Sequence, residues 1–123
     1  MTRERLALGQ WGEETAARYL KGRGARILER NYRTPVGEID IIARYKRQLL
    51  FVEVKTRRSK LFGSPLEAVG AHKQRQIIRT AQWYLSDSDS GKLQPRFDVL
   101  AVMPGKDGEA QIEHLENAFG LDT

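Results

Sequence analysis

The sequence predicts an α/β protein in which a mixed β-sheet is flanked by helices, with the elements in the order α-β-β-β-α-β-β. Two long segments have apolar or small residues at helical spacing. Five shorter segments are rich in aliphatic residues and are separated by turn residues, as strands are. The chain of 123 residues shows neither a repeat nor a linker, so residues 1–123 are expected to form a single domain.

The first half of the chain predicts one helix and three strands. Small residues and Glu13 recur on one face of segment 3–21, and Gly22 ends this helix. The turn residues Pro35 and Gly37 separate the first two strands, and a short polar connection makes a hairpin of the second and third. The three strands are expected at residues 25–33, 38–44 and 49–56.

The second half predicts a helix followed by two strands. Ile77, Ala81 and Tyr84 belong to the apolar stripe of a helix over residues 71–86. Because three consecutive strands precede this helix, it is expected to cross over to the next strand of the sheet. The last two strands are expected at residues 96–103 and 110–115.

Composition limits the classes of function. The chain has no cysteine, which excludes disulfides and thiolate metal sites. Its longest apolar run, residues 49–52, is far shorter than the roughly 20 residues that a membrane-spanning helix needs. The first residues lack the apolar core of a signal peptide. We therefore expect a cytoplasmic protein without a membrane partner.

The charge favours a polyanionic partner such as nucleic acid. The net charge is +5 and the sequence pI is about 9.7. Residues 44–60 contain seven basic residues and one acid, Glu53. The alternative is a solvated basic face without a binding role. A lone acid inside such a block, however, must tolerate or use the positive field around it.

Two acids interrupt otherwise apolar strands. Asp40 lies within the run Ile-Asp-Ile-Ile-Ala, and Glu53 is followed two residues later by Lys55. A buried carboxylate is costly unless it is paired or binds a metal, and strand alternation places Glu53 and Lys55 on one face. If the two strands pair, Asp40 and Glu53 converge and, with the carbonyl of Val54, suit a hard cation such as Mg²⁺ or Mn²⁺. Lys55 could then orient the attacking water or stabilise charge on a phosphate.

The pattern Glu-x-Lys alone is weak evidence, because about one acid-x-Lys match is expected by chance in a chain of this composition. A structural ion pair between Glu53 and Lys55 is the alternative. The strand context and the second carboxylate favour a site. Glu13 adds a third carboxylate on the small-residue face of the first helix, which can pack closely on the sheet; its alternative is a solvated helical glutamate.

Several motifs are similar to those of the YraN family of bacterial proteins. They are Gly-Gln-Trp-Gly-Glu at 9–13, Asn-Tyr-Arg at 31–33, Gly-Glu-Ile-Asp-Ile-Ile at 37–42, Phe-Val-Glu-Val-Lys-Thr-Arg at 51–57, Phe-Gly-Ser-Pro at 62–65, Lys73, and Arg-Phe-Asp-Val at 96–99. The similarity covers most of the chain. This family in turn resembles archaeal Holliday-junction resolvases and the wider restriction-endonuclease-like, or PD-(D/E)xK, superfamily, which implies the same fold.

The superfamily resemblance implies a Mg²⁺ site built from a helix glutamate, a strand aspartate and the Glu-x-Lys pair. Carried over, the catalytic residues are Glu13, Asp40, Glu53 and Lys55, and the metal ligands are Glu13, Asp40, Glu53 and Val54. Ile39 stands where the superfamily often has a proline, which is a common departure. Resolvases of the superfamily act as dimers, which leaves a homodimer of this chain open.

Basic residues near the expected site are candidates for phosphate contacts, with simple solvation as the alternative for each. They are Arg57, Arg58 and Lys60 after the third strand, and Lys73, Arg75 and Arg79 on the second helix. Glu38 shares the expected face of Asp40 and is a candidate metal-shell or water-positioning group, or a turn cap.

Other polar and aromatic residues are expected to be structural. Asp98 is expected to pair with an arginine. The remaining expectations are that His72 and His114 are structural or solvated, and that Trp11, Trp83 and Tyr84 lie in the core, with base stacking as the alternative for these aromatic residues.

The sequence thus predicts a metal-dependent endonuclease that hydrolyses DNA and selects branched or junction DNA, in repair or recombination. One alternative is a non-catalytic nucleic-acid-binding scaffold of the same fold, because a fold does not fix an activity. A weaker alternative is a role in RNA processing.

Overall fold

The computed structural model describes residues 3–58, 64–87 and 91–120. Within them the elements follow the predicted order: α1 (Arg3–Gly22), β1 (Arg26–Thr34), β2 (Gly37–Tyr45), β3 (Gln48–Thr56), α2 (Ala71–Asp87), β4 (Gln94–Pro104) and β5 (Ala110–Phe119). The main difference from the prediction is β5, which continues to Phe119. Neither of these helices combines the length and hydropathy that a membrane crossing requires.

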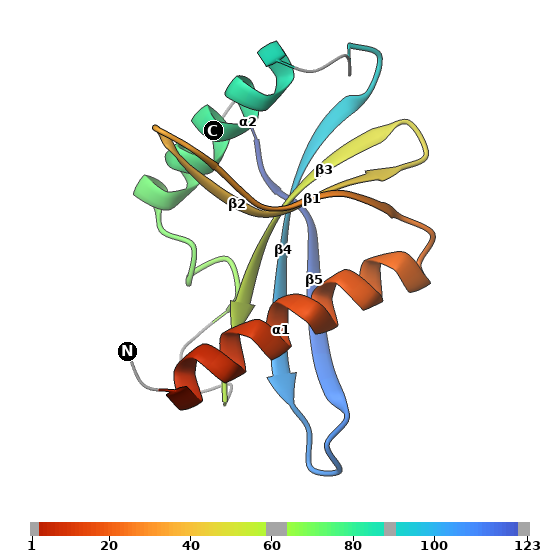
Figure 1. Cartoon of the computed structure of the whole chain (residues 1–123), viewed down its shortest axis with the longest axis vertical. Coiled ribbons are helices and arrows are strands. Elements are labelled where there is room, and N and C mark those ends of the chain that lie inside the picture. Colours follow the sequence, from red (N-terminus) through yellow and green to blue (C-terminus); the bar gives the residue numbers. More distant parts are fainter. Residues whose placement is uncertain (1–2, 59–63, 88–90, 121–123) are drawn as a thin grey trace.

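The strands form one open mixed sheet in the order β1-β2-β3-β4-β5 (Figure 1). Neighbouring strands are antiparallel except β3 and β4, which run parallel. Parallel neighbours need a long crossover connection, and α2 lies in that connection. The predicted fold class and the predicted crossover are therefore confirmed.

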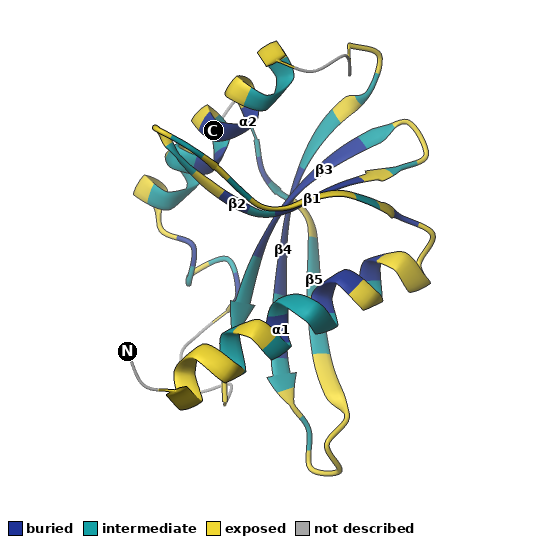
Figure 2. Ribbon diagram, viewed as in Figure 1, coloured by how far each residue is buried: buried dark blue, intermediate teal, exposed yellow. Residues whose placement is uncertain are grey.

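The two helices cover opposite faces of the sheet. Leu20 of α1 packs in one buried cluster with Leu50 of β3, whereas Ile77 of α2 packs in a second cluster with Phe51. Successive residues of β3 thus point to different helices, as strand alternation requires. Figure 2 shows the buried residues concentrated on the central strands β3 and β4. A carboxylate on these strands is consequently removed from water on either face.

Strand β2 changes its packing face at Asp40. Ile39 lies in the buried cluster on the α2 side of the sheet, whereas Ile41 lies in the cluster on the α1 side. Residues two apart share a face in a regular strand, so regular alternation is broken at the residue between them. The pairing of β2 with β3 also ends here, with Ile41 opposite Val52. Asp40 therefore lies where the two strands separate.

Gly12 allows α1 to approach the end of β3. A Cβ atom at this position would overlap the side chain of Thr56. Only glycine permits this contact without movement of one of the two elements. The close approach carries the neighbouring Glu13 toward the end of the sheet where β2 and β3 separate.

Candidate active site

Asp40 and Glu53 lie together where β2 and β3 separate. The Oδ2 atom of Asp40 accepts a hydrogen bond of 2.8 Å from the backbone N–H of Val54. The side chains of Asp40 and Glu53 are themselves in hydrogen-bonding contact. The carboxylate of Asp40 thus bridges the two strands beyond the last backbone pair, and the predicted convergence of the two acids is what the structure shows.

Glu53 is a buried acid next to a second acid. Its exposed fraction is only 4%. Burial, followed by the negative charge of Asp40 and the hydrogen bond with it, raises the pKa of Glu53 to about 8. The positive charges of Lys73 and Lys55 oppose this rise without cancelling it. At neutral pH the protonated form of Glu53 is therefore favoured.

Two lysines from different elements approach the same oxygen of Glu53. The Nζ atom of Lys55 lies 3.7 Å from Oε2, and the Nζ atom of Lys73 lies 3.9 Å from it. Lys55 shares the strand face of Glu53 because it follows two residues later. Lys73 comes from the first turn of α2. The sequence predicted Lys73 only as a phosphate contact, since its proximity to Glu53 depends on tertiary packing.

Glu13 lies beside the pair without completing a three-residue cluster. Burial and the charge of Asp40 raise the pKa of Glu13, whereas Arg30 and a hydrogen bond from Asn31 lower it. Glu13 is therefore within electrostatic reach of Asp40. The described part of the chain, however, contains no group of three or more His, Cys, Asp or Glu side chains placed to hold one metal ion. The preformed unit is the pair of Asp40 and Glu53.

The donor set of this pair fits a hard divalent cation. Two adjacent carboxylates offer oxygen ligands, which Mg²⁺ and Mn²⁺ prefer. Ionisation of the buried Glu53 next to Asp40 leaves negative charge that a cation would neutralise. The roles of Glu13 and of the Val54 carbonyl as ligands stay predictions.

Asn31 is a site residue that the sequence analysis missed. It has a left-handed backbone, with φ of 53°, inside β1. Its neighbours Arg30 and Tyr32 pair with Ile41 and Ile39, so Asn31 lies opposite Asp40. Its side chain donates the hydrogen bond to Glu13. Asparagine is among the few residues that tolerate this backbone, but its occurrence within a strand gave no usable signal.

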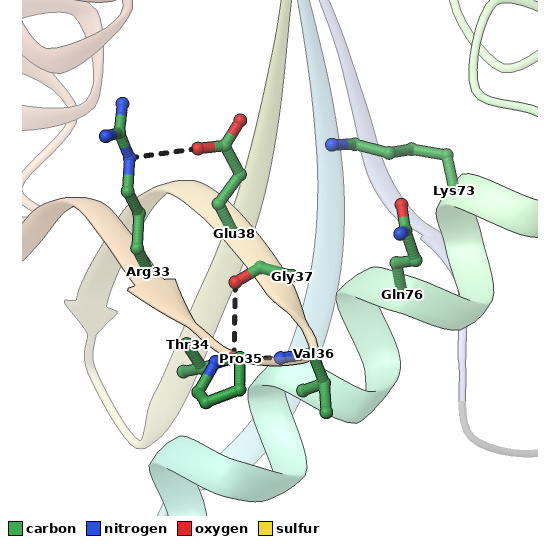
Figure 3. Close-up of a pocket in the computed structure, with 8 residues that line it drawn as sticks. All are labelled: Arg33, Thr34, Pro35, Val36, Gly37, Glu38, Lys73 and Gln76. Atoms are coloured by element: carbon green, nitrogen blue, oxygen red, sulfur yellow. Dashed lines mark hydrogen bonds and ion pairs between the residues drawn. The ribbon is translucent and has the colours of Figure 1, made fainter.

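A shallow hollow of about 390 Å³ lies between the β1–β2 turn and α2, and Lys73, which approaches Glu53, is one of its lining residues. Figure 3 shows Lys73 and Gln76 on one side of it and Arg33 and Glu38 on the other. Glu38 forms an exposed ion pair with Arg33 at 3.2 Å. This ion pair is a third role for Glu38, beside the metal-shell or water-positioning role and the turn cap that the sequence suggested. Basic side chains on both sides suit an anionic ligand.

The other predicted phosphate contacts are more dispersed. The guanidinium of Arg57 donates to the carbonyl of Ser64 at 3.3 Å. Arg58 and Arg75 are exposed, and Lys60 lies outside the described residues. Lys73 faces the acid pair, whereas Arg75 faces solvent, so the helix divides its cations between two faces.

Asp98 forms a separate polar cluster, as predicted. The guanidinium of Arg96 donates to both of its oxygens at 2.9 and 2.8 Å. His114 contacts it at 2.7 Å, and the backbone N–H of Asn117 donates to it at 3.0 Å. The second imidazole nitrogen of His114 hydrogen-bonds to Tyr19. His114 is thus structural, and both carboxylate oxygens of Asp98 are hydrogen-bonded.

Trp83 corrects the expectation that the aromatic residues lie in the core. Trp11 and Tyr84 pack against the two buried clusters, but 45% of Trp83 is exposed. The sheet-facing stripe of α2 is occupied by Ile77 and Ala81, and Trp83 lies off this stripe.

Comparison with known proteins places the chain among bacterial relatives. Residues 12–102 match the family described as "Uncharacterised protein family UPF0102". A UPF0102 protein of Syntrophotalea carbinolica is 61% identical over 122 residues, covering 99% of this chain and 98% of that protein. UPF0102 proteins of Rhodococcus jostii and Caldanaerobacter subterraneus are 50% and 48% identical, covering 93% and 91% of this chain and 97% and 93% of those proteins. The family predicted from the motifs, YraN, is this one, and the chain belongs to the UPF0102 family.

Proposed function

We propose that this protein is a metal-dependent endonuclease that hydrolyses DNA phosphodiester bonds and selects branched or junction DNA in repair or recombination. The observation that carries the proposal is the pairing of Asp40 with the buried Glu53, with the ammonium groups of Lys55 and Lys73 beside it. The resemblance to the PD-(D/E)xK superfamily supports the same assignment.

Each residue has a separate task in this proposal. Asp40 and Glu53 would hold Mg²⁺ or Mn²⁺, which polarises a phosphate and lowers the pKa of a bound water. Lys55 places a positive charge where negative charge develops on the phosphate oxygens. Lys73 binds a phosphate oxygen from the α2 side. Glu13, held by Asn31, orients water at the edge of the pair.

The charge of the protein supports a nucleic-acid substrate. The net charge is +5, and Arg58 and Arg75 are exposed on the surface. Contacts between such side chains and phosphates are independent of base sequence and weaken as salt rises. Selection by DNA shape therefore fits this surface better than selection by sequence.

The test is cleavage of labelled branched, flapped, duplex and single-stranded DNA with Mg²⁺ or Mn²⁺. Wild type is expected to cut a branched substrate, and Lys55→Ala to be at least about a hundredfold slower. Lys106→Ala, which removes an exposed lysine from the β4–β5 turn, is the matched control and should cut normally. Equal product from wild type and Lys55→Ala would reject the site.

The alternative function is a nucleic-acid-binding scaffold without cleavage. It is favoured by one observation, the lack of a preformed three-ligand cluster among the described residues. Salt-dependent DNA binding without product in any divalent metal, and unchanged in Asp40→Asn, would support the scaffold over the nuclease.

A further inference from the structure

We infer that the outer face of α2 binds an unpaired single-stranded segment of nucleic acid, with a base stacked on Trp83 and phosphates on Arg75 and Arg79. The inference deepens the proposed function, because it takes nucleic acid as the ligand and gives the substrate a single-stranded arm. It does not depend on cleavage.

The three side chains form one row along the helix. Arg75, Arg79 and Trp83 follow one another at intervals of four residues, so each lies about 6 Å along the axis from the next. All three are exposed, and Trp83 keeps 45% of its surface in contact with solvent. The other large apolar side chains that are exposed in the described part of the chain, Leu6, Leu28 and Val36, lie outside α2.

The row carries positive charge that the described residues do not neutralise. Arg75 and Arg79 form no ion pair with any acid that the structure describes. The only acid of α2 itself is Asp87, at its end. No described lysine or arginine side chain makes a cation–π contact with the indole ring of Trp83. Unpaired arginines next to an open aromatic ring are the pattern that binds phosphates and unstacked bases.

The position of the row relative to the acid pair points to a particular substrate. The same helix places Lys73 at 3.9 Å from Glu53 in its first turn, and the row begins two residues later, on the solvent-facing side of the helix, and runs toward the other end of α2. A strand that lies along the row and also contacts Lys73 would reach Asp40 and Glu53. A duplex presents only phosphates to such a face, whereas stacking on Trp83 requires a base that is free of its partner. The substrate that fits is DNA with a flap or a splayed arm.

The test uses the fluorescence of Trp83 without divalent metal. Trp11→Phe leaves Trp83 as the only tryptophan, and this protein is titrated in EDTA with a thymine oligonucleotide, a blunt duplex and a flapped duplex. The thymine oligonucleotide and the flap are expected to quench the emission, and the blunt duplex is not. Trp83→Ala in the wild-type background should bind the oligonucleotide roughly tenfold or more weakly, measured by anisotropy of labelled DNA.

Two further variants make the result specific. Trp83→Phe keeps an aromatic face and should recover part of the lost affinity. Gln82→Ala removes an exposed neighbour on the same helix and should bind as wild type does. Far-UV circular dichroism confirms that each variant is folded.

Unchanged affinity of Trp83→Ala, or the absence of quenching, would overturn the inference. Self-association that Trp83→Ala abolishes, without any effect on DNA, would also overturn it, because a second copy of the chain would then cover this face. Quenching and Trp83-dependent binding without metal-dependent product would leave the inference standing while the nuclease fails. Metal-dependent cleavage that Trp83→Ala does not change would leave the nuclease standing while this inference fails.

Discussion

Asp98 on β4 and Glu53 on β3 are buried to the same degree, yet their surroundings have opposite effects. The exposed fractions are 0% and 4%. Burial favours the neutral form of Asp98, but hydrogen bonds from His114, Arg96 and the backbone of Asn117 outweigh it and lower its pKa. For Glu53, burial, the negative charge of Asp40 and the hydrogen bond with Asp40 together raise the pKa to about 8. The set of neighbours, not burial, therefore separates the two acids.

The geometry of the cations explains this difference. The guanidinium of Arg96 lies 2.8 Å from Asp98, which is a direct charge-assisted hydrogen bond. Lys55 and Lys73 lie 3.7 and 3.9 Å from Glu53, which is too long for such a bond. The negative charge of Asp98 is thus neutralised by direct hydrogen bonds within the fold, whereas Asp40 and Glu53 are suited to bind a further cation.

The largest expected effect is on cleavage. Asp40→Asn and Glu53→Gln should each reduce the single-turnover rate about a thousandfold or more, because each removes a ligand charge that holds the metal. Glu116→Gln, an exposed acid that lies within 3.7 Å of Arg96 in the other cluster, is the control and should cut at the wild-type rate. Normal cleavage by either site variant would show that the pair is not catalytic.

The next effect is on stability. Asp98→Asn should lower the free energy of unfolding by about 3–5 kcal/mol, since it removes the charged partner that Arg96, with only 12% of its side chain exposed, contacts at 2.8 Å. Urea denaturation measures the change. Glu53→Gln should not destabilise the metal-free protein at pH 8 and above. Equal losses in the two variants would contradict the distinction between a structural acid and a functional one.

The third effect is a pH dependence confined to one window. The pKa of Glu53 is about 8 in the folded protein, against an ordinary glutamate pKa of 4.5, so the folded state binds this proton more tightly. The resulting stabilisation is full below about pH 4.5 and is lost as pH rises through 8, by an amount on the order of a few kcal/mol. Metal-free wild type should therefore lose stability between pH 5 and 8.

Glu53→Gln provides the control for this profile and should remove the slope. Asp98 cannot cause it, because its lowered pKa gives stability that is lost only as pH falls below about 4. A slope that persists in Glu53→Gln would mean that another group titrates in the window.

The smallest effect concerns Asn31. Asn31→Ala and Asn31→Gly both remove the hydrogen bond to Glu13 and should slow cleavage severalfold to a similar extent. Only Asn31→Ala should also destabilise the fold, by about 1 kcal/mol, because alanine is strained at φ of 53°. Normal cleavage by Asn31→Gly would show that Asn31 is needed only because it tolerates the left-handed backbone, and not for its contact with Glu13.

The fold was predictable because its local patterns agree with its tertiary structure. Apolar periodicity located both helices and all the strands in the described residues, and turn residues separated the strands. The prediction for β5 stopped at residue 115, whereas the strand continues to Phe119. Glu116 and Asn117 are polar, and Asn117 has a left-handed backbone with φ of 51°. Its backbone N–H is held by Asp98, a tertiary contact that no local pattern indicates.

The site was predictable only for the residues that lie on the paired strands β2 and β3. The proximity of Asp40 and Glu53 follows from the pairing of β2 with β3, and the position of Lys55 follows from alternation along β3. The role of Lys73 beside Glu53 depends on how α2 docks, and that of Asn31 depends on an unusual backbone. Trp83 was assigned to the core from residue type, although its position off the sheet-facing stripe decides its exposure.

The most direct test of the central claim is the binding of Mn²⁺, followed by electron paramagnetic resonance at pH 8, in wild type, Glu53→Gln and Glu116→Gln. A cation site at Asp40 and Glu53 predicts saturable binding in wild type and Glu116→Gln, and loss of that binding in Glu53→Gln. Binding of equal strength in all three proteins, or no binding in wild type, would contradict it.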